Sequence, residues 1–377
     1  MTGLDTTVRR LISSGPESTA GSPAGAALGL RTATATVTGV AGSRTAGSDP
    51  RPMTVDTSHD LASVTKVVAT TASLISLVSQ GAVRLDDPVT DYLPEFSSGG
   101  KDTVTITDLL RHRGGLWEWQ PLYLGDRAEA AAFDYAVNLP LRYAPGSGRH
   151  YSDLGFMLLG RVVEIAAGER LDAAVRELVT EPLEMPATWF GEPHNDNVAT
   201  SAFSDHTEQT MVDTGVPHPV LSSEGFTGWR HCPIDGEVND GNAFHAFGGV
   251  SGHAGLFSTL DDLLTFTSRF AHYRDHTELW DPAVVETFLT DGPDAGQVLG
   301  FRTYPISIDG ATTTVYGHPG FVGCAIGFAP TAGLGLVWCG NRLLTHHTPV
   351  RNDDLWEQVL AAASARLAGT DFEPERC

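Results

Sequence analysis

The sequence predicts a two-region α+β fold, with a central antiparallel sheet built from both ends of the chain, flanking helices, and an inserted, mostly helical region. Strand-forming segments punctuated by glycine occur near the two ends, at about residues 26–45 and 298–339. Helix start and stop signals dominate between them. The chain has 377 residues, 41% of them hydrophobic, which is enough for a large core.

Local signals predict the elements in order along the chain. Residues 26–45 are rich in Thr, Val and Ala, which favours an antiparallel strand pair. Asp60 is the expected N-cap of a helix that runs to Gln80 and stops at Gly81. Ser63 then lies in its first turn, where free backbone N–H groups favour developing negative charge. Further helices are expected over residues 107–115 (N-cap Thr107), 126–138, 151–167, 171–180, 258–270 (N-cap Ser258) and 352–367, with a shorter one from Pro282, and strands over 298–306, 312–316, 322–329 and 334–339.

We expect residues 1–377 to form a single catalytic unit with three regions. The sheet region would consist of approximately residues 20–60 and 258–377, and the helical region of approximately residues 61–189. Residues of about 190–257 are rich in Gly, His, Asn and Asp and show little periodicity. A segment this long is more than a connection, which predicts a lid or a wall of the functional site.

Charge and hydropathy exclude several classes of partner. The formal net charge of −22 argues against binding to nucleic acid or anionic membranes, because both need clustered basic residues. The first residues show no basic segment followed by an apolar run, and the apolar run at 67–78 is too short to span a bilayer. The expected location is therefore cytoplasmic.

The four cysteines, Cys232, Cys324, Cys339 and Cys377, do not make a disulfide framework in a chain of this length. Cys324 and Cys339 flank the turn at 330–333 symmetrically and are placed to face each other across a hairpin. In a reducing compartment we interpret them as small core residues.

The chain contains only two lysines, Lys66 and Lys101, against 22 arginines. Lysine can lose its proton when it is desolvated, whereas arginine effectively cannot. A serine three residues before a lysine on a helix, as in Ser63-x-x-Lys66, places the hydroxyl and the amine on one face. This arrangement activates a serine nucleophile without histidine.

Two further short motifs follow in order, Tyr151-Ser152-Asp153 and His318-Pro319-Gly320. With Ser63-x-x-Lys66 they resemble the S-x-x-K, S-D-N-type and K-T-G triplet of the serine β-lactamase and penicillin-binding-protein superfamily. The tyrosine and the histidine make the chain similar to the branch of class C β-lactamase-related serine hydrolases and esterases. The resemblance covers about residues 25–365 and implies a β-lactamase/transpeptidase-like fold.

The resemblance implies a role for each residue. Ser63 would attack a carbonyl carbon, and its amide, with that of Phe321 after Gly320, would form the oxyanion hole. Lys66 and Tyr151 would move the proton, and the sequence leaves open which of them is the base. Supporting or substrate-binding positions are Asp153, His318, Gly320, Trp117 and Arg342, and helix capping is the alternative role of Asp153. Trp117 and Trp119 follow the Gly114-Gly115 turn and are candidates for lining an acyl pocket, with core packing as the alternative.

Two positions depart from the family pattern. Asp153 stands where asparagine is common, and a carboxylate beside Lys66 would raise the pKa of that lysine. His318 replaces a lysine, so a permanent cation for a substrate carboxylate is missing. This favours an uncharged ester or amide over β-lactam or peptidoglycan substrates.

The sequence therefore predicts a serine hydrolase that cleaves a small ester or amide through an acyl-Ser63 intermediate. β-Lactam and peptide-like compounds belong to this class of substrates. The alternative is an acyltransferase that passes the same acyl group to an amine or alcohol, and a third reading is a catalytically silent binding protein. No metal or cofactor is expected, because His245 and His253 lack metal-ligand spacing and suit a loop-stabilising role. The oligomeric state stays open.

Overall fold

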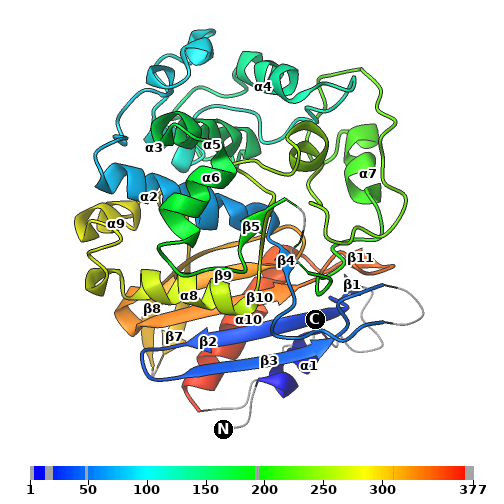
Figure 1. Cartoon of the computed structure of the whole chain (residues 1–377), viewed down its shortest axis with the longest axis vertical. Helices are drawn as coiled ribbons and strands as arrows, with labels where there is room; N and C mark the ends of the chain where they lie inside the picture. Colours follow the sequence, from blue (N-terminus) through cyan, green and yellow to red (C-terminus); the bar gives the residue numbers. More distant parts are fainter. Residues whose placement is uncertain are drawn as a thin grey trace.

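The computed structural model describes residues 4–12, 20–46, 50–191, 193, 195–308 and 310–369, and it confirms the predicted sheet built from both ends of the chain. Six antiparallel strands lie in the order β3-β2-β10-β9-β8-β7. Figure 1 shows this sheet in the lower half and most helices above it. The strands are β1 (Ala20–Gly21), β2 (Gly25–Arg31), β3 (Thr36–Gly42), β4 (His59–Asp60), β5 (Trp189–Phe190), β6 (Leu256–Ser258), β7 (Arg302–Ile308), β8 (Ala311–Pro319), β9 (Ala325–Ala329), β10 (Leu334–Gly340) and β11 (Thr348–Pro349).

Helices cover both faces of the sheet and fill the upper half of the molecule (Figure 1). Alternate residues of β2 face opposite ways: Leu28 packs with α1 and α10, whereas an added Cβ at Gly29 would lie 2.6 Å from Leu264 of α8. The α-helices are α1 (Asp5–Ile12), α2 (Ala72–Ser79), α3 (Ile106–Leu110), α4 (Glu129–Asn138), α5 (Asp153–Ala167), α6 (Leu171–Val175), α7 (His206–Thr214), α8 (Leu260–Ala271), α9 (Pro282–Phe288) and α10 (Asn352–Leu367).

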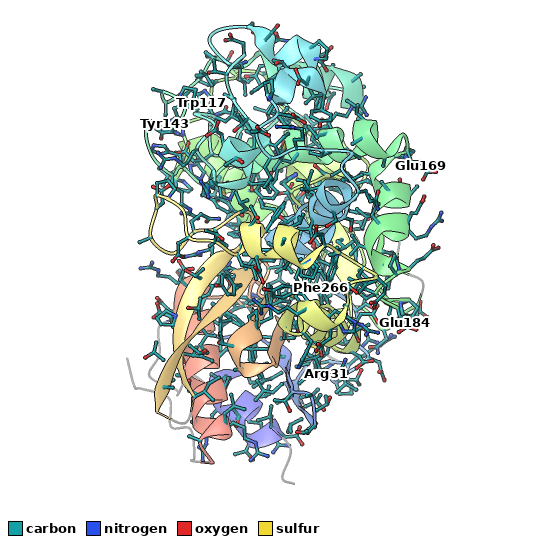
Figure 2. The ribbon with its side chains drawn as sticks, turned by 90° about the vertical axis from the view of Figure 1, so that its left-hand side faces the viewer. Arg31, Trp117, Tyr143, Glu169, Glu184 and Phe266 are labelled. Carbon is teal, nitrogen blue, oxygen red and sulfur yellow. The ribbon has the colours of Figure 1, made fainter. Side chains whose placement is uncertain are left out.

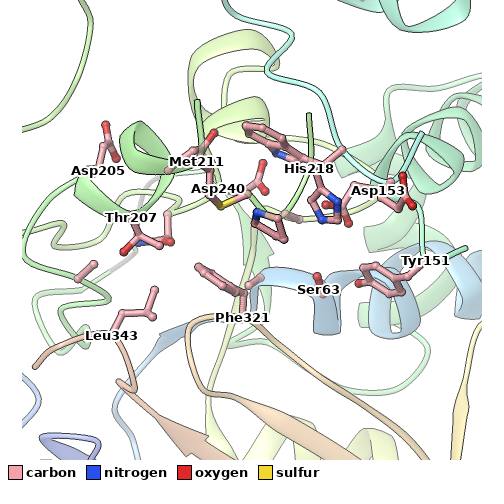
Figure 3. Close-up of a pocket in the computed structure, with 18 of the residues that line it drawn as sticks. Ser63, Tyr151, Asp153, Asp205, Thr207, Met211, His218, Asp240, Phe321 and Leu343 are labelled. Atoms are coloured by element: carbon pink, nitrogen blue, oxygen red, sulfur yellow. The ribbon is translucent and has the colours of Figure 1, made fainter. Parts of the chain in front are cut away.

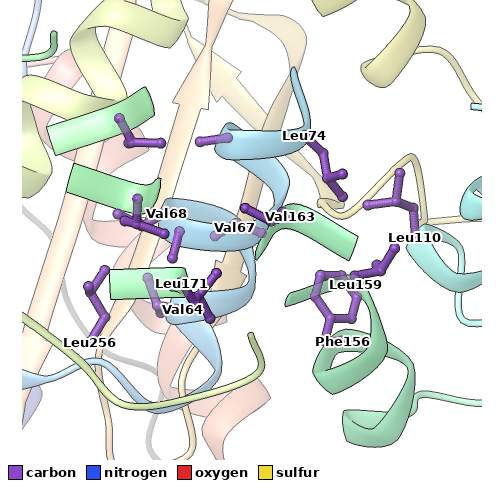
Figure 4. Packing of buried hydrophobic residues seen from close by; sticks show 14 of the residues in the cluster. Val64, Val67, Val68, Leu74, Leu110, Phe156, Leu159, Val163, Leu171 and Leu256 are labelled. Atoms are coloured by element: carbon purple, nitrogen blue, oxygen red, sulfur yellow. The ribbon is translucent and has the colours of Figure 1, made fainter. Parts of the chain in front are cut away.

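The helix that carries the Ser-x-x-Lys motif is irregular where the motif lies. A turn of 3-10 helix, η1 (Ala62–Val64), leads into a π-helical stretch, η2 (Lys66–Thr71), and only then into α2. All six residues of η2 are buried, and Figure 4 shows Val67 and Val68 packed among side chains of the neighbouring helices. π-Helical stretches are frequent at functional sites because they re-aim side chains within a helix.

This same stretch, Ala62–Ser79, is long and apolar enough to cross a membrane by composition alone. However, 83% of it is buried inside the protein, which identifies it as the core helix around which the helical half packs.

Three predicted helix caps are wrong by one or two residues. Thr105, not Thr107, caps α3, and Thr259, not Ser258, caps α8. Asp60 belongs to β4 instead of capping the core helix, which begins after Leu61. An N-cap residue needs extended backbone outside the helix, and Thr105 and Thr259 have it, with ψ near 166°.

Segment 190–257 contains α7 and is joined to the core through a small sheet of order β4-β6-β5. Its end runs into β6, which pairs with β4 immediately before the core helix. The last residues of the segment therefore lie beside the first residues of that helix. The proposed division of the chain into three regions stays a prediction.

Cys324 lies immediately before β9 and Cys339 lies in β10, and both are buried, as predicted for small core residues. Cys232 is an exposed free cysteine. Cys377 lies outside the described residues.

Candidate active site

Ser63 lies in the first turn of the core helix, directly after a strained residue. Ala62 has a φ of 43°, a left-handed conformation that costs a non-glycine residue about 1–2 kcal/mol. The buried carboxylate of Asp60 accepts hydrogen bonds from the amides of Ala62 (2.7 Å) and Asn239 (2.6 Å). These bonds hold the turn in place and tie it to segment 190–257.

Lys66 is fully buried, and its ammonium group has three acceptors around it. Nζ lies 2.9 Å from Ser63 Oγ, 3.0 Å from the carbonyl oxygen of His253 and 2.7 Å from Asp153 Oδ1. Burial lowers the pKa of Lys66, but Asp153 and Tyr151 outweigh it, so the pKa lies above its usual value. The lysine is therefore charged at rest, as the carboxylate at position 153 led us to expect.

Tyr151 lies beside Ser63 and lines the same cavity. Its half-buried phenol interacts with Ser63 and Lys66, and its ring lies between those of His112 (centroids 4.5 Å apart) and His318 (5.8 Å). Burial raises the pKa of Tyr151 above its usual value. Neither Lys66 nor Tyr151 is thus in its basic form at rest.

The helix α5 places Asp153 against the lysine. Ser152 is the N-cap of α5, because its hydroxyl accepts from the amide of Gly155 at 3.1 Å. The side chain of Asp153, the first helical residue, is thereby free to pair with Lys66. The alternative reading of Asp153 as a helix cap is wrong.

Two backbone amides are available to hold an oxyanion. Neither the amide of Ser63 nor that of Phe321 has a hydrogen-bond partner among the described residues. Phe321 follows the end of β8, next to Gly320, where an added Cβ would lie 2.3 Å from the carbonyl oxygen of Leu61. Only glycine at position 320 lets the loop approach the start of the core helix this closely.

Arg342 supports this loop from behind and does not line the site. Its guanidinium donates to the carbonyl oxygens of Phe321 (3.0 Å) and Val350 (2.9 Å) and lies over the Phe321 ring. Of the two roles expected for Arg342, supporting or substrate-binding, the contacts favour the supporting one, because its donors position Phe321.

His318 and Trp117 also lie outside the lining of the site. His318 is 2% exposed, donates through Nδ1 to the carbonyl oxygen of Pro319 (2.8 Å), and has a pKa lowered well below its usual value, first by burial and then by Lys66. The neutral ring packs behind Tyr151. Trp117 bonds the carbonyl oxygen of Pro140 and lies beside Tyr143 at the edge of the helical half (Figure 2).

A cavity of about 230 Å³ opens over Ser63 (Figure 3). Its floor carries Ser63, Tyr151, Asp153 and Phe321, whose side chain is 45% exposed. Most of its remaining lining comes from segment 190–257, in agreement with the predicted wall. The residues of that wall are Ala202, Ser204, Asp205, Thr207, Glu208, Met211, Pro217, His218, Asn239, Asp240 and Ala254.

Of the two tryptophans that the sequence offered for the pocket, Trp119 lines the cavity and Trp117 does not. His112 accepts a hydrogen bond from the amide of Ser152 (3.0 Å), and its ring packs at a tilt against that of Tyr151. No role was predicted for it; the only signal is its position in the segment Leu109-Leu110-Arg111-His112 before the Gly114-Gly115 turn. His253 is loop-stabilising through its ring, as expected, but its carbonyl oxygen also binds Lys66.

No group of three His, Cys, Asp or Glu side chains within the described ranges is arranged to hold a metal ion. The prediction that the protein uses no metal or cofactor stays a prediction, as does its oligomeric state.

Comparison with known proteins agrees with this geometry. Residues 8–361 match the Beta-lactamase family. The chain is 32% identical over 324 residues to an N-acetylmuramyl-L-alanine amidase of Bacillus subtilis, an alignment that covers 80% of this chain and 71% of that protein.

Two solved structures are similar in fold. One is an octameric penicillin-binding protein homologue from Pyrococcus abyssi, with a TM-score of 0.68 and 20% identity over 93% of this chain and 74% of that one. The other is EstCE1, a hydrolase with promiscuous acyltransferase activity, with a TM-score of 0.63 and 21% identity over 86% of this chain and 91% of that one.

Proposed function

The chain belongs to the Beta-lactamase family, and on that premise we propose that it is a serine hydrolase that cleaves a small ester or amide through an acyl-Ser63 intermediate. The observation that carries the proposal is the 2.9 Å contact between Ser63 Oγ and a fully buried Lys66, which Tyr151 joins. A buried lysine beside a serine at a helix start, under an open cavity, has no evident structural need.

In the first half of the reaction, Ser63 Oγ forms a bond to the carbonyl carbon and its proton passes to the Lys66–Tyr151 pair. The carbonyl oxygen becomes an oxyanion held by the amides of Ser63 and Phe321. The bond to the leaving nitrogen or oxygen then breaks, and the pair donates the proton to it. In the second half, water adds to the acyl carbon by the same route, and the acid and free Ser63 are released.

The resting charges mean that a proton must leave the pair before it can act as a base. Lys66 is held in its charged form and Tyr151 in its neutral form. Activity should therefore increase as the pH rises above neutrality.

A fluorophosphonate probe tests the proposal. It should label the wild-type protein, and Ser63→Ala should lose both the labelling and at least 10⁴-fold of p-nitrophenyl ester hydrolysis. Ser204→Ala, which removes another serine hydroxyl from the cavity lining, is the matched control and should retain both. Ester hydrolysis that survives Ser63→Ala would rule the proposal out.

Acyl transfer is the second candidate, because segment 190–257 forms most of the cavity lining over Ser63 and so limits the access of water. Product analysis with and without an added amine distinguishes the two. Formation of the amide at the expense of the acid would favour transfer.

A further inference from the structure

The cavity over Ser63 is acidic. Five of its lining residues are carboxylic acids, and none of the lining residues is lysine or arginine. Because the same cavity contains Ser63 and Phe321, these acidic side chains influence which substrate can bind there. They are Glu118, Asp153, Asp205, Glu208 and Asp240.

Three of the five already have a cation of the protein's own. Asp153 pairs with Lys66 at 2.7 Å, Asp205 with Arg230 at 2.7 Å, and Glu118 with Arg142 at 2.5 Å. These three carboxylates have no need of a positive charge from a ligand.

Glu208 has hydrogen-bond donors but no cation. Its Oε1 accepts from the hydroxyl of Tyr123 (2.7 Å) and its Oε2 from the amide of Gly241 (2.9 Å), and no basic side chain of the described residues forms an ion pair with it. Two donors on two oxygens suit the ionised carboxylate. Burial and the charge of Asp240 oppose ionisation and raise the pKa of Glu208 to about 8. Glu208 therefore keeps its proton, and a positive charge bound beside Asp240 would favour its ionised form.

Asp240 lies beside it with one oxygen free. Its Oδ1 is bound by the ring of His253 (2.9 Å) and the amide of Ala243 (2.8 Å), while its Oδ2 has no donor among the residues that the structure describes. Figure 3 shows the Asp240 side chain above Phe321, on the Ser63 side of Met211. A cation in the cavity can therefore bind Asp240 Oδ2, with the carboxyl group of Glu208 beside it.

The position of Asp240 indicates which half of the substrate carries the charge. His253 contacts Asp240 through its ring and Lys66 through its carbonyl oxygen (3.0 Å), so a single residue separates Asp240 from the lysine at the nucleophile. A cation held by Asp240 lies near the carbonyl that Ser63 attacks. The rest of the cavity offers apolar surface from Trp119, Met211 and Leu343.

We propose that the cavity selects substrates whose acyl half carries a protonated amine, namely aminoacyl amides or esters, with Asp240 as the anionic partner of that amine and Glu208 as the neighbouring carboxyl group. This inference rests on the proposed acyl-Ser63 chemistry and adds the substrate class to it.

The test compares two p-nitroanilides that differ only in the amine: phenylalanine p-nitroanilide, in both enantiomers, and 3-phenylpropionyl p-nitroanilide. At pH 6.5, where the amine is protonated, we expect the wild-type protein to prefer one amine-bearing enantiomer by about 10–100-fold in kcat/KM. Asp240→Asn should reduce this ratio about tenfold or more, and Glu208→Gln should reduce it by a smaller factor. Glu286→Gln is the matched control: it removes a carboxylate of α9, outside the cavity lining, that pairs with Arg274 (2.8 Å), so the ratio should remain.

A second measurement does not depend on turnover or on the variants. Phenylalanine amide should slow fluorophosphonate labelling of wild-type Ser63 at a concentration at least tenfold lower than 3-phenylpropanamide does. Equal protection by the two amides, or an unchanged ratio in both Asp240→Asn and Glu208→Gln, would overturn the amine assignment while the hydrolase assignment stands. Absence of Ser63 labelling would instead overturn the proposed function.

Discussion

The floor and the roof of the cavity are built in different ways. The floor consists of the core helix, the start of α5 and the end of β8, and all six residues of η2 are buried. The roof is the wall that segment 190–257 forms over Ser63, and α7, which lies in this segment, has no buried residue. A well-packed floor can hold Ser63, Lys66 and Tyr151 within the tenths of an ångström that proton transfer needs. The roof can change its side chains without disturbing the core, which suits the choice of substrate.

The largest expected effect is on the floor. Tyr151→Phe removes one hydroxyl from the contact with Ser63 and Lys66 and keeps the ring between His112 and His318. Because general acid–base groups contribute about 10²–10⁴-fold, we expect kcat/KM to fall by about 10³-fold. Steady-state kinetics and a thermal melt check this. A loss below about tenfold would mean that Lys66 moves the proton alone.

Gly320→Ala should act next most strongly. The added Cβ would lie 2.3 Å from the carbonyl oxygen of Leu61, so the loop must move and take the Phe321 amide with it. Removal of one oxyanion donor costs about 10²–10³-fold, which sets the expected fall in kcat. Gly225→Ala, with open space around its Cβ, is the control and should change little. Equal kinetics of the two variants would exclude the Phe321 amide as a donor.

Asp153→Asn should move the pH profile. In the wild type, Asp153 raises the pKa of Lys66 and of Tyr151, so the basic form accumulates only at high pH. Without the carboxylate, burial of Lys66 is opposed only by Tyr151, and the pKa of Lys66 falls. The rise of kcat/KM with pH should therefore shift to lower pH by about 1–3 units. A profile that stays in place would show that another group limits the reaction.

The smallest effect is expected on the roof, where a matched pair separates stability from selectivity. Met211→Ala should lower kcat/KM about tenfold through lost apolar contact and change the free energy of unfolding by less than about 1 kcal/mol. Leu159→Ala, a fully buried residue packed near the core helix (Figure 4), should cost about 2–5 kcal/mol. Chemical denaturation measures both. If Met211→Ala lowered the free energy of unfolding as much as Leu159→Ala does, the roof would be as important for stability as the core, and the proposed difference between the two regions would be wrong.

Strong local signals explain why much of the fold was predictable. The alternation of β2 and the caps and glycines of α5, with Gly168 in a left-handed conformation after it, depend on neighbours in the sequence. The N-caps of α3 and α8 were misplaced because several threonines and serines compete there, and only the extended backbone of one of them decides. The irregular start of the core helix had no local signal, since tertiary packing holds Ala62 in its strained conformation.

The sequence by itself determined the proposed reactive group of this protein: a rare lysine one turn after a serine, with a tyrosine and an aspartate in a second motif. Helical spacing places the first two residues together, and the order of the motifs identified their partners. The tertiary structure alone decided the cavity. Trp119, Glu208 and Asp240 come from distant segments, and their contribution depends on which carboxylates find a cation across the fold. Such a balance of charge is a property of contacts in space, which no local pattern of residues encodes.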